Sequence, residues 1–345
     1  MPDGIRILGI KGFGTANAGI EYYNPRTRKN EILSMPRDNI KNITANDFRR
    51  LRNFLTIVTA TPEGAALLGF APGLLGTIEK SVNLEFDRPQ VFANHKEIAK
   101  ILNQQRGDWR VKMVDPYKLD ADLIRMQKAL GTPARLVEES HPSVYREAMR
   151  AASGVMTDHL LREGPKSWRT FRFFADSDFH NGQAFIDAGK KTIYLIDPGQ
   201  SVRISKEEYQ IGKTLVRTLS DTMDVNNAVR MLNASSINPN PKVPLFTVDE
   251  VKVIQKIPDP IEGFFKFLSL ASSKGGEVPV PTVQWVLGIN RQRVLGEKIG
   301  QPIEARLAKT FAWDSVKGMA LRPGGCAKDL IALLKRLAPE TLPGR

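Results

Sequence analysis

Two aspartates in the middle of the chain have the spacing of a phosphoryl-transfer site. Asp178 opens the run Asp-Phe-His-Asn-Gly-Gln and lies five positions before Gln183, while Asp197 follows in the run Ile-Asp-Pro-Gly. In phosphoryl-transfer sites of this layout the first aspartate orients or deprotonates the acceptor, and the second holds Mg²⁺ against the nucleotide phosphates. We therefore expect Asp178 to be catalytic and expect Asp197 to bind the metal together with the amide oxygen of Gln183.

The residues between the two aspartates predict a β-hairpin that would bring the two carboxylates together. Residues 184–196 contain two apolar runs on either side of a Gly-Lys turn, a pattern typical of paired strands. Ser205, followed three residues later by Glu208, predicts a capped helix after the hairpin. A hairpin with an aspartate at each end is also common in proteins without this chemistry, so the prediction depends on the features occurring together.

Asp176 and His180 are the other polar candidates in this loop. Asp176 lies seven residues before Gln183, so the loop spacing favours Asp178. A single histidine is more often structural than a metal ligand, and we expect His180 to support the loop beside Asp178. We keep His180 with Asp178 as a catalytic candidate.

A pair of glycines near the N-terminus is the candidate phosphate-covering turn. Gly12 and Gly14 lie in residues 5–37, which have the pattern of β-strands. Glycine allows the backbone to approach phosphate oxygens closely. We expect Gly12 and Gly14 to contact a nucleotide.

Composition predicts a globular protein with two lobes or domains. The chain has 345 residues, of which 41% are hydrophobic and 25% charged, and this is ample for a sizeable core. It has neither an apolar run long enough to cross a membrane nor a secretory signal, so we expect a cytoplasmic location. The single cysteine, Cys326, excludes an intramolecular disulfide framework and a multi-cysteine metal site.

The net charge of +13 predicts an anionic partner. Nucleotide phosphates, an anionic membrane surface and an acidic protein all fit, as does a simple solvated basic surface. Basic residues are not interleaved with aromatic ones as in single-strand grooves, which disfavours nucleic acid.

Residues 171–232 resemble the C-lobe of the ABC1 (AarF/UbiB-type) atypical kinases. That family has an Asp-x-His-Pro-Gly-Asn loop and a strand that ends in Asp-Phe-Gly; this chain has Asp178-Phe-His-Asn-Gly-Gln and Leu-Ile-Asp197-Pro-Gly. Two residues depart from the family pattern. Gln183 replaces the metal-binding Asn and carries its amide one methylene further out, and Pro198 replaces the Phe and stiffens the turn.

The resemblance implies a bilobal α+β fold like that of protein kinases, with a small β-rich N-lobe and a mostly helical C-lobe. It also implies ATP and Mg²⁺ as cofactors, and a kinase or ATPase that transfers the γ-phosphoryl group to an acceptor the sequence does not identify. The alternative is a catalytically impaired pseudokinase that acts as a scaffold through its basic surface.

Two placements of the small lobe are open, because a kinase N-lobe needs a strand lysine and a helix glutamate. In the first placement Lys112 is the phosphate lysine and Glu147 is its partner, but only 66 residues separate Lys112 from Asp178. In the second, the glycine hairpin opens the lobe, Ser34 falls where the lysine should be, and Leu51 falls near the glutamate position. We prefer the second, which then needs another cation at the phosphates, with Lys11, Lys29 and Lys112 as candidates.

The chain is expected to divide into a β-rich N-lobe region (1–85), a helical region (86–165) and a C-lobe with the catalytic segment (166–345). Within these we predict a strand at 82–86, a helix at 120–130 and a helix at about 143–163. Residues 238–244 are rich in Asn and Pro and are the best linker candidate. A last helix is expected at 327–337.

Overall fold

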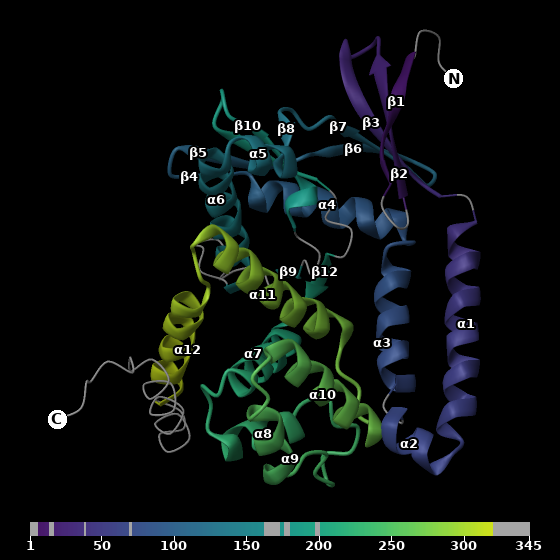
Figure 1. Cartoon of the computed structure of the whole chain (residues 1–345), viewed down its shortest axis with the longest axis vertical. Helices are drawn as coiled ribbons and strands as arrows, with labels where there is room; N and C mark the ends of the chain where they lie inside the picture. Colours follow the sequence, from purple (N-terminus) through teal and green to yellow (C-terminus); the bar gives the residue numbers. More distant parts are fainter. Residues whose placement is uncertain are drawn as a thin grey trace, which may run out of the picture.

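The computed structural model describes residues 6–13, 17–37, 39–68, 71–161, 173–175, 180–196 and 201–319. For residues 10–13, 65–67, 73–74, 173–175 and 313–319 it describes the backbone alone. Two sheets lie at the top of Figure 1, a helical arm stands at its right-hand side, and a group of helices fills the lower part. The candidates Asp178, Asp197 and Gly14 lie outside the described residues, as do Cys326 and the expected helix at 327–337.

The first sheet is an antiparallel meander extended by two later strands. Its order is β1-β2-β3-β7-β6, formed by β1 (Arg6–Phe13), β2 (Asn17–Asn24), β3 (Lys29–Pro36), β6 (Pro116–Asp120) and β7 (Leu123–Gln127). The buried Glu31 carboxylate fastens this sheet. Burial alone would raise its pKa, but hydrogen bonds from Thr27, Tyr117, Tyr22 and Asn24 outweigh burial and lower it.

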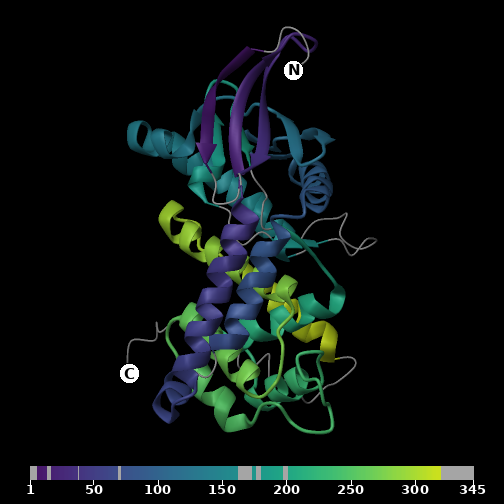
Figure 2. The ribbon, with the colours of Figure 1, turned by 90° about the vertical axis from the view of Figure 1, so that its right-hand side faces the viewer.

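A helical arm follows β3. It consists of α1 (Ile40–Thr59), α2 (Pro62–Leu68) and α3 (Ala71–Leu84). Figure 2 shows α1 running along the outside of α3. The arm docks on the C-terminal helices through α3, where Lys80 pairs with Glu277 and Gln284 donates to Ser81.

The second sheet carries the hairpin and is mixed. Its order is β4-β5-β11-β10-β8, formed by β4 (Gln104–Arg106), β5 (Trp109–Met113), β8 (Thr132–Pro133), β10 (Ala184–Asp187) and β11 (Thr192–Leu195). The helices α4 (Arg88–Leu102), α5 (Ala134–Ser140) and α6 (Pro142–Leu161) pack around it. One apolar core, with Val111 and Ile193 at its centre, joins this sheet to α4 and α6.

The lower part is helical apart from a short two-stranded ribbon. The strands β9 (Phe173–Ala175) and β12 (Val202–Ile204) form the ribbon; the helices are α7 (Lys206–Leu219), α8 (Val225–Asn233), α9 (Val248–Gln255), α10 (Pro260–Ser273), α11 (Val280–Ile299) and α12 (Glu304–Met319). Trp285 is fully buried in their core and donates its indole N–H to Leu160 O at 2.9 Å. The Tyr209 ring meets it edge-on at 5.2 Å.

The α+β class, with a β-rich N-terminal region and a mostly helical C-terminal part, is confirmed. Two local predictions were wrong. Residues 82–86 continue and end α3 rather than forming a strand. The expected helix at 120–130 is instead the end of β6, a turn at Ala121 with φ 51°, and β7, because pairing with β3 buries Ile124 to 1% exposure. Tertiary pairing overrides local helix propensity there.

Three further expectations are refined. The strands of the first 85 residues end at Pro36 and helices fill 40–84, while 86–165 contains five strands as well as helices. The Asn- and Pro-rich stretch at 238–244 is a loop, but Ile237 and Leu245 on its two sides join the same core. It therefore separates no domains. Within the described part of the chain, no helix is long and apolar enough to cross a membrane.

Candidate active site

The predicted hairpin is present, and it ends where the two candidate motifs begin. Strands β10 and β11 are antiparallel, with Ala184 opposite Leu195. Asp187 caps the turn by accepting from Lys190 N at 3.1 Å. Beyond the last strand pair, Ile196 N donates to Gln183 O at 2.8 Å. This bond joins the end of the candidate catalytic loop to the residue immediately before Asp197.

A second strand pair closes the other end of both motif segments. Strand β9 precedes the loop and β12 follows the Asp-Pro-Gly turn, and they pair antiparallel with Ala175 opposite Val202. In the sequence, residues 176–182 and residues 197–201 therefore each connect these same two strand pairs. The two predicted aspartates belong to these two segments.

The end of the loop is a single 3-10 turn, η1 (Asn181–Gln183), which His180 caps. His180 Nδ1 accepts from Gly182 N at 2.9 Å. The exposed His180 ring thus caps the 3-10 turn. Gln183 is buried, with 7% exposure.

Replacing Gly182 by Ala is expected to lower stability by about 1 kcal/mol, through loss of the cap hydrogen bond. A Cβ at this position would lie 2.7 Å from His180 Cε1 and would push the ring off its capping position. Gly189→Ala in the hairpin turn is the matched control, since its Cβ would meet only Asp187 Oδ1 at 3.7 Å. Urea unfolding of both variants tests this; equal stability of the two would contradict the role of His180.

Asn181 fastens the same turn to the surrounding helices. Its Nδ2 donates to Glu138 Oε2 at 3.0 Å, and Glu138 also pairs with Lys298 Nζ at 2.6 Å. The hydrogen bond to Glu138 raises the pKa of Lys298. Glu138 of α5, itself paired with Lys298 of α11, therefore holds this turn.

Helix α4 contacts the described chain on both sides of residues 197–200 through two adjacent residues. On the exit side, buried Asn94 donates to Ser201 O at 2.9 Å. On the entry side, His95 Nε2 lies 2.6 Å from Val114 O, and Val114 N donates to Leu195 O at 2.9 Å.

Sequence reasoning missed both residues. The available signal was that Asn94 lies at helical spacing from Ile98 and Leu102, so a polar residue falls on an otherwise apolar face.

Acid is expected to weaken the fold at His95. Burial lowers the pKa of His95 to about 4 although the hydrogen bond to Val114 opposes this, so the folded ring stays neutral and Nε2–H donates. The unfolded chain takes up a proton below about pH 6.5, so stability falls as pH decreases from there toward the folded pKa.

Between about pH 7 and about pH 5 this histidine should account for a loss of about 2 kcal/mol. His95→Gln keeps a donor but cannot titrate, so urea unfolding of this variant should show a correspondingly smaller loss. An unchanged pH dependence would contradict the assignment.

Lys112 lies in β5, which runs parallel to β11 with Lys112 opposite Tyr194. Its Nζ is 5.9 Å from the centroid of the Tyr194 ring. Among the described residues Lys112 has no acidic partner, and the pair with Glu147 that the first placement requires is not formed. The strand pairing nevertheless puts Lys112 opposite Tyr194, which precedes Asp197 by three residues in the sequence.

The second placement puts Ser34 in β3, and an arginine lies beside it. The Arg88 guanidinium, 3% exposed, donates to Ser34 O at 3.1 Å, Ser34 Oγ at 3.0 Å and Asn17 Oδ1 at 2.9 Å. The helix that packs on this sheet is α4, while Leu51 lies on the outer helix α1. Gly12 lies in β1 opposite Gly19 in β2.

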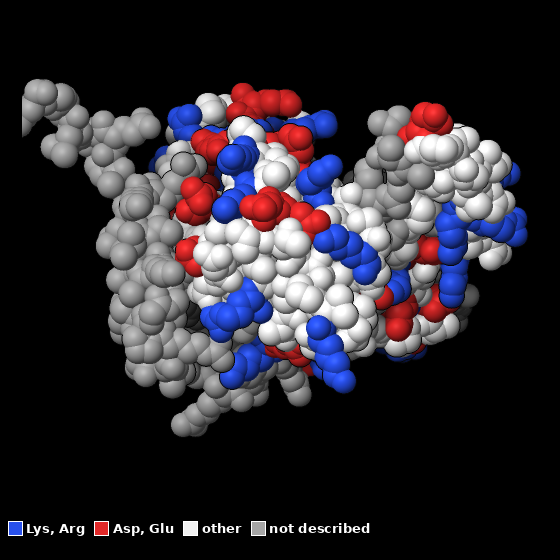
Figure 3. Space-filling model, turned by 90° about the horizontal axis from the view of Figure 1, so that it is seen from below, with Lys and Arg blue, Asp and Glu red and all other residues white. Residues whose placement is uncertain are grey.

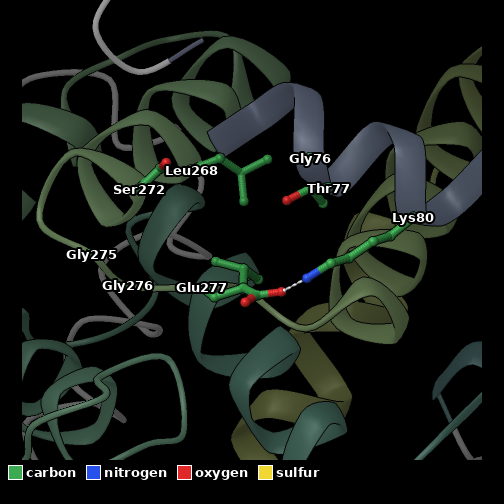
Figure 4. Close-up of a pocket in the computed structure, with 9 residues that line it drawn as sticks. Gly76, Thr77, Lys80, Leu268, Ser272, Gly275, Gly276 and Glu277 are labelled. Atoms are coloured by element: carbon green, nitrogen blue, oxygen red, sulfur yellow. Dashed lines mark hydrogen bonds and ion pairs between the residues drawn. The ribbon is translucent and has the colours of Figure 1, made fainter. Parts of the chain in front are cut away.

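The described residues outside the two motifs show no metal-binding cluster and one cavity of note. They contain no group of three or more His, Cys, Asp or Glu that could hold a metal. A cavity of about 330 Å³ lies between α3 and α10 (Figure 4), bridged by the Lys80–Glu277 pair. No residue of the two motifs lines this cavity, so it is separate from the candidate site.

No protein-family model matches the chain, and none of the curated proteins matches it.

Proposed function

We propose that this chain is an ATP-dependent phosphotransferase or ATPase with a bilobal, kinase-like fold, and that its catalytic segment is related to that of the ABC1 atypical kinases it resembles. The observation that carries the proposal is that the same two backbone pairings bound both motif segments. Ala175 pairs with Val202 at one end, and Gln183 O accepts from Ile196 N at the other.

Because the same two pairings bound both segments, we expect the carboxylates of Asp178 and Asp197 to lie near each other. Paired strands lie about 4.8 Å apart, and each motif segment spans only a few residues between the same two pairings. In this proposal Asp197 and Gln183 supply the metal ligands and Asp178 faces the acceptor. A carboxylate and an amide are hard oxygen donors, the kind that Mg²⁺ takes while keeping waters and nucleotide phosphates.

The proposed roles follow from this arrangement. Asp178 orients the acceptor or attacking water, and His180 keeps the loop in shape through its cap. Asp197 and Gln183 would hold Mg²⁺, which supplies charge neutralisation at the phosphates when bound. Gly12 and Gly14 would cover the phosphates; Gly12 lies in β1, the edge strand of the first sheet.

Lys112 is the best candidate for the phosphate cation. It lies on the strand next to β11 and has no acidic partner among the described residues. Lys11 and Lys29 belong to the first sheet, on strands with no described pairing to the hairpin. The proposal therefore combines the glycine hairpin of the second placement with the lysine of the first.

One observation favours the pseudokinase alternative. The strand position for the usual lysine holds Ser34, and the nearest cation, Arg88, binds the backbone and side chains of the sheet itself. A chain with this arrangement could bind nucleotide weakly or act as a scaffold through its basic surface. Figure 3 shows basic and acidic side chains interspersed over the underside, without a single-sign field.

Thermal unfolding with and without nucleotide tests the proposal. A ligand that binds only the folded state adds about 2.7 kcal/mol at a hundred times its Kd. ATP with Mg²⁺ should stabilise the chain, and ATP with EDTA should do so much less. Absence of any shift with any nucleotide would refute nucleotide binding, whereas a shift without phosphate release would favour the pseudokinase.

A further inference from the structure

The outer face of α1 carries a row of exposed, large apolar side chains. Their exposures are 49% for Ile43, 45% for Leu51, 56% for Phe54 and 72% for Ile57. Leu51, Phe54 and Ile57 follow at intervals of three, and Ile43 lies eleven residues, or about three turns, before Phe54. We call these four residues the α1 stripe.

The stripe is the uncovered part of a wider apolar arc. Within the arm, α1 packs chiefly on α2 and α3. Leu55, 7% exposed, lies on the side of α1 that faces these two helices. In Figure 1 α1 stands at the right-hand edge of the molecule, and in Figure 2 it faces the viewer along its whole length.

The charged residues of the same helix are mostly basic, and by helical spacing Arg50 and Asp47 lie on the face of the stripe itself. Its charged residues are Lys41, Arg49, Arg50, Arg52 and a single acid, Asp47. Arg52 is used within the arm, where it pairs with Glu79 at 2.8 Å. Arg50 meets Asp47 only at 3.8 Å with both side chains largely exposed, a weak pair. Two arginines next to the stripe, Arg49 and Arg50, thus remain available to an anionic surface.

We propose that α1 binds an anionic phospholipid surface, with the α1 stripe in the interfacial layer and Arg49 and Arg50 at the headgroups. A helix that exposes bulky apolar residues with arginines among and beside them can lie in the plane of a membrane interface, because long arginine side chains reach up to the headgroups. Each basic residue near an anionic leaflet strengthens binding about fivefold. The chain's net charge of +13 acts in the same direction.

A second copy of the chain is a less suitable occupant of this face. A two-fold contact through the α1 stripe would bring the basic flanks of two identical helices together, in a chain whose net charge already opposes association. The proposal concerns a surface of the arm and does not depend on phosphoryl transfer.

Co-sedimentation of the full chain with vesicles tests the proposal. One set of vesicles is phosphatidylcholine alone, and the other is phosphatidylcholine mixed with phosphatidylserine. Wild type should bind the anionic vesicles and lose this binding as salt is raised. The double variants Phe54→Ser/Ile57→Ser and Arg49→Glu/Arg50→Glu should each lower the partition coefficient about tenfold or more.

Matched variants elsewhere on the surface serve as controls. Val243→Ser/Val253→Ser changes two valines exposed by 57% and 60%, and Lys242→Glu/Lys266→Glu makes the same change of charge. Both should bind vesicles nearly as wild type does; equal losses in these controls would overturn the assignment to α1. Absence of binding, or equal binding to neutral vesicles, would also overturn it, as would a dimer in sedimentation equilibrium that Phe54→Ser/Ile57→Ser dissociates.

Discussion

Replacing Asp197 by Asn is expected to reduce ATP turnover by a factor on the order of a thousand, because the several kcal/mol that a bound metal contributes to the transition state would be lost. Replacing Asp178 by Asn should reduce turnover by about a hundred- to ten-thousand-fold, the range for a positioned base. The two variants should differ in binding. Asp178→Asn should keep the Mg²⁺-dependent stabilisation by ATP, and Asp197→Asn should lose it.

Phosphate release at saturating MgATP measures the first effect, and thermal unfolding measures the second. Asp249→Asn is the control, since the Asp249 side chain is 95% exposed and meets Lys252 only at 3.6 Å. This control should turn over ATP as wild type does. If turnover survived both Asp178→Asn and Asp197→Asn, the activity would belong to another site or to a contaminating enzyme.

Replacing Gly131 by Ala should destabilise the fold by about 2–4 kcal/mol. Gly131 lies between β7 and β8, where the chain passes from the first sheet to the second. Its φ is +93°, and a Cβ there would lie 2.4 Å from Ile186 O and 2.6 Å from Asp187 N, both backbone atoms of β10. Backbone cannot move aside as a flexible side chain can, so β8 must separate from the hairpin or the hairpin must shift.

Gly107→Ala separates backbone strain from this close approach. Gly107 also has a positive φ, +59°, but a Cβ there would meet nothing within 4 Å, so about 1 kcal/mol is expected. Urea unfolding of the two variants gives the comparison. If both lost the same stability, the contact between Gly131 and β10 would be unimportant. A greater loss of ATP turnover in Gly131→Ala would in addition link this contact to the site.

The hairpin between the motifs could be predicted because its signals are local. Alternating apolar residues, the Gly-Lys turn and the capping box at Ser205 and Glu208 all lie within a few residues of the structure they determine. The resemblance to a kinase-like catalytic segment depends on the same stretch. It is therefore the part of the candidate site that sequence reasoning describes best.

The failures share a physical cause, which is pairing between residues far apart in the chain. Residues 120–130 have helical propensity, but β3 offers them hydrogen-bond partners at least 90 residues away, with Ser34 opposite Ile124. The hydrogen bond from Asn94 to Ser201 O joins residues that lie 107 positions apart in the chain. Local pattern contains no information about such partners, so neither β7 nor the role of α4 at the turn could be predicted.

The α1 stripe lies between these cases. The amphipathic pattern of α1 is local, but how much of its apolar arc α3 covers depends on the tertiary fold. Whether Phe54 and Ile57 are exposed can be judged only from the structure, which shows where α3 packs.

Isothermal titration with a non-hydrolysable ATP analogue tests the proposed Asp178–Asp197 site most directly. We predict saturable binding of one analogue per chain with Mg²⁺, and affinity about tenfold or more lower in EDTA, since the metal bridges the phosphates to the protein. In Asp197→Asn the affinities with and without Mg²⁺ should become equal. Absence of saturable binding to wild type, or a Mg²⁺ dependence that persists unchanged in Asp197→Asn, would contradict a metal–nucleotide site at these two segments.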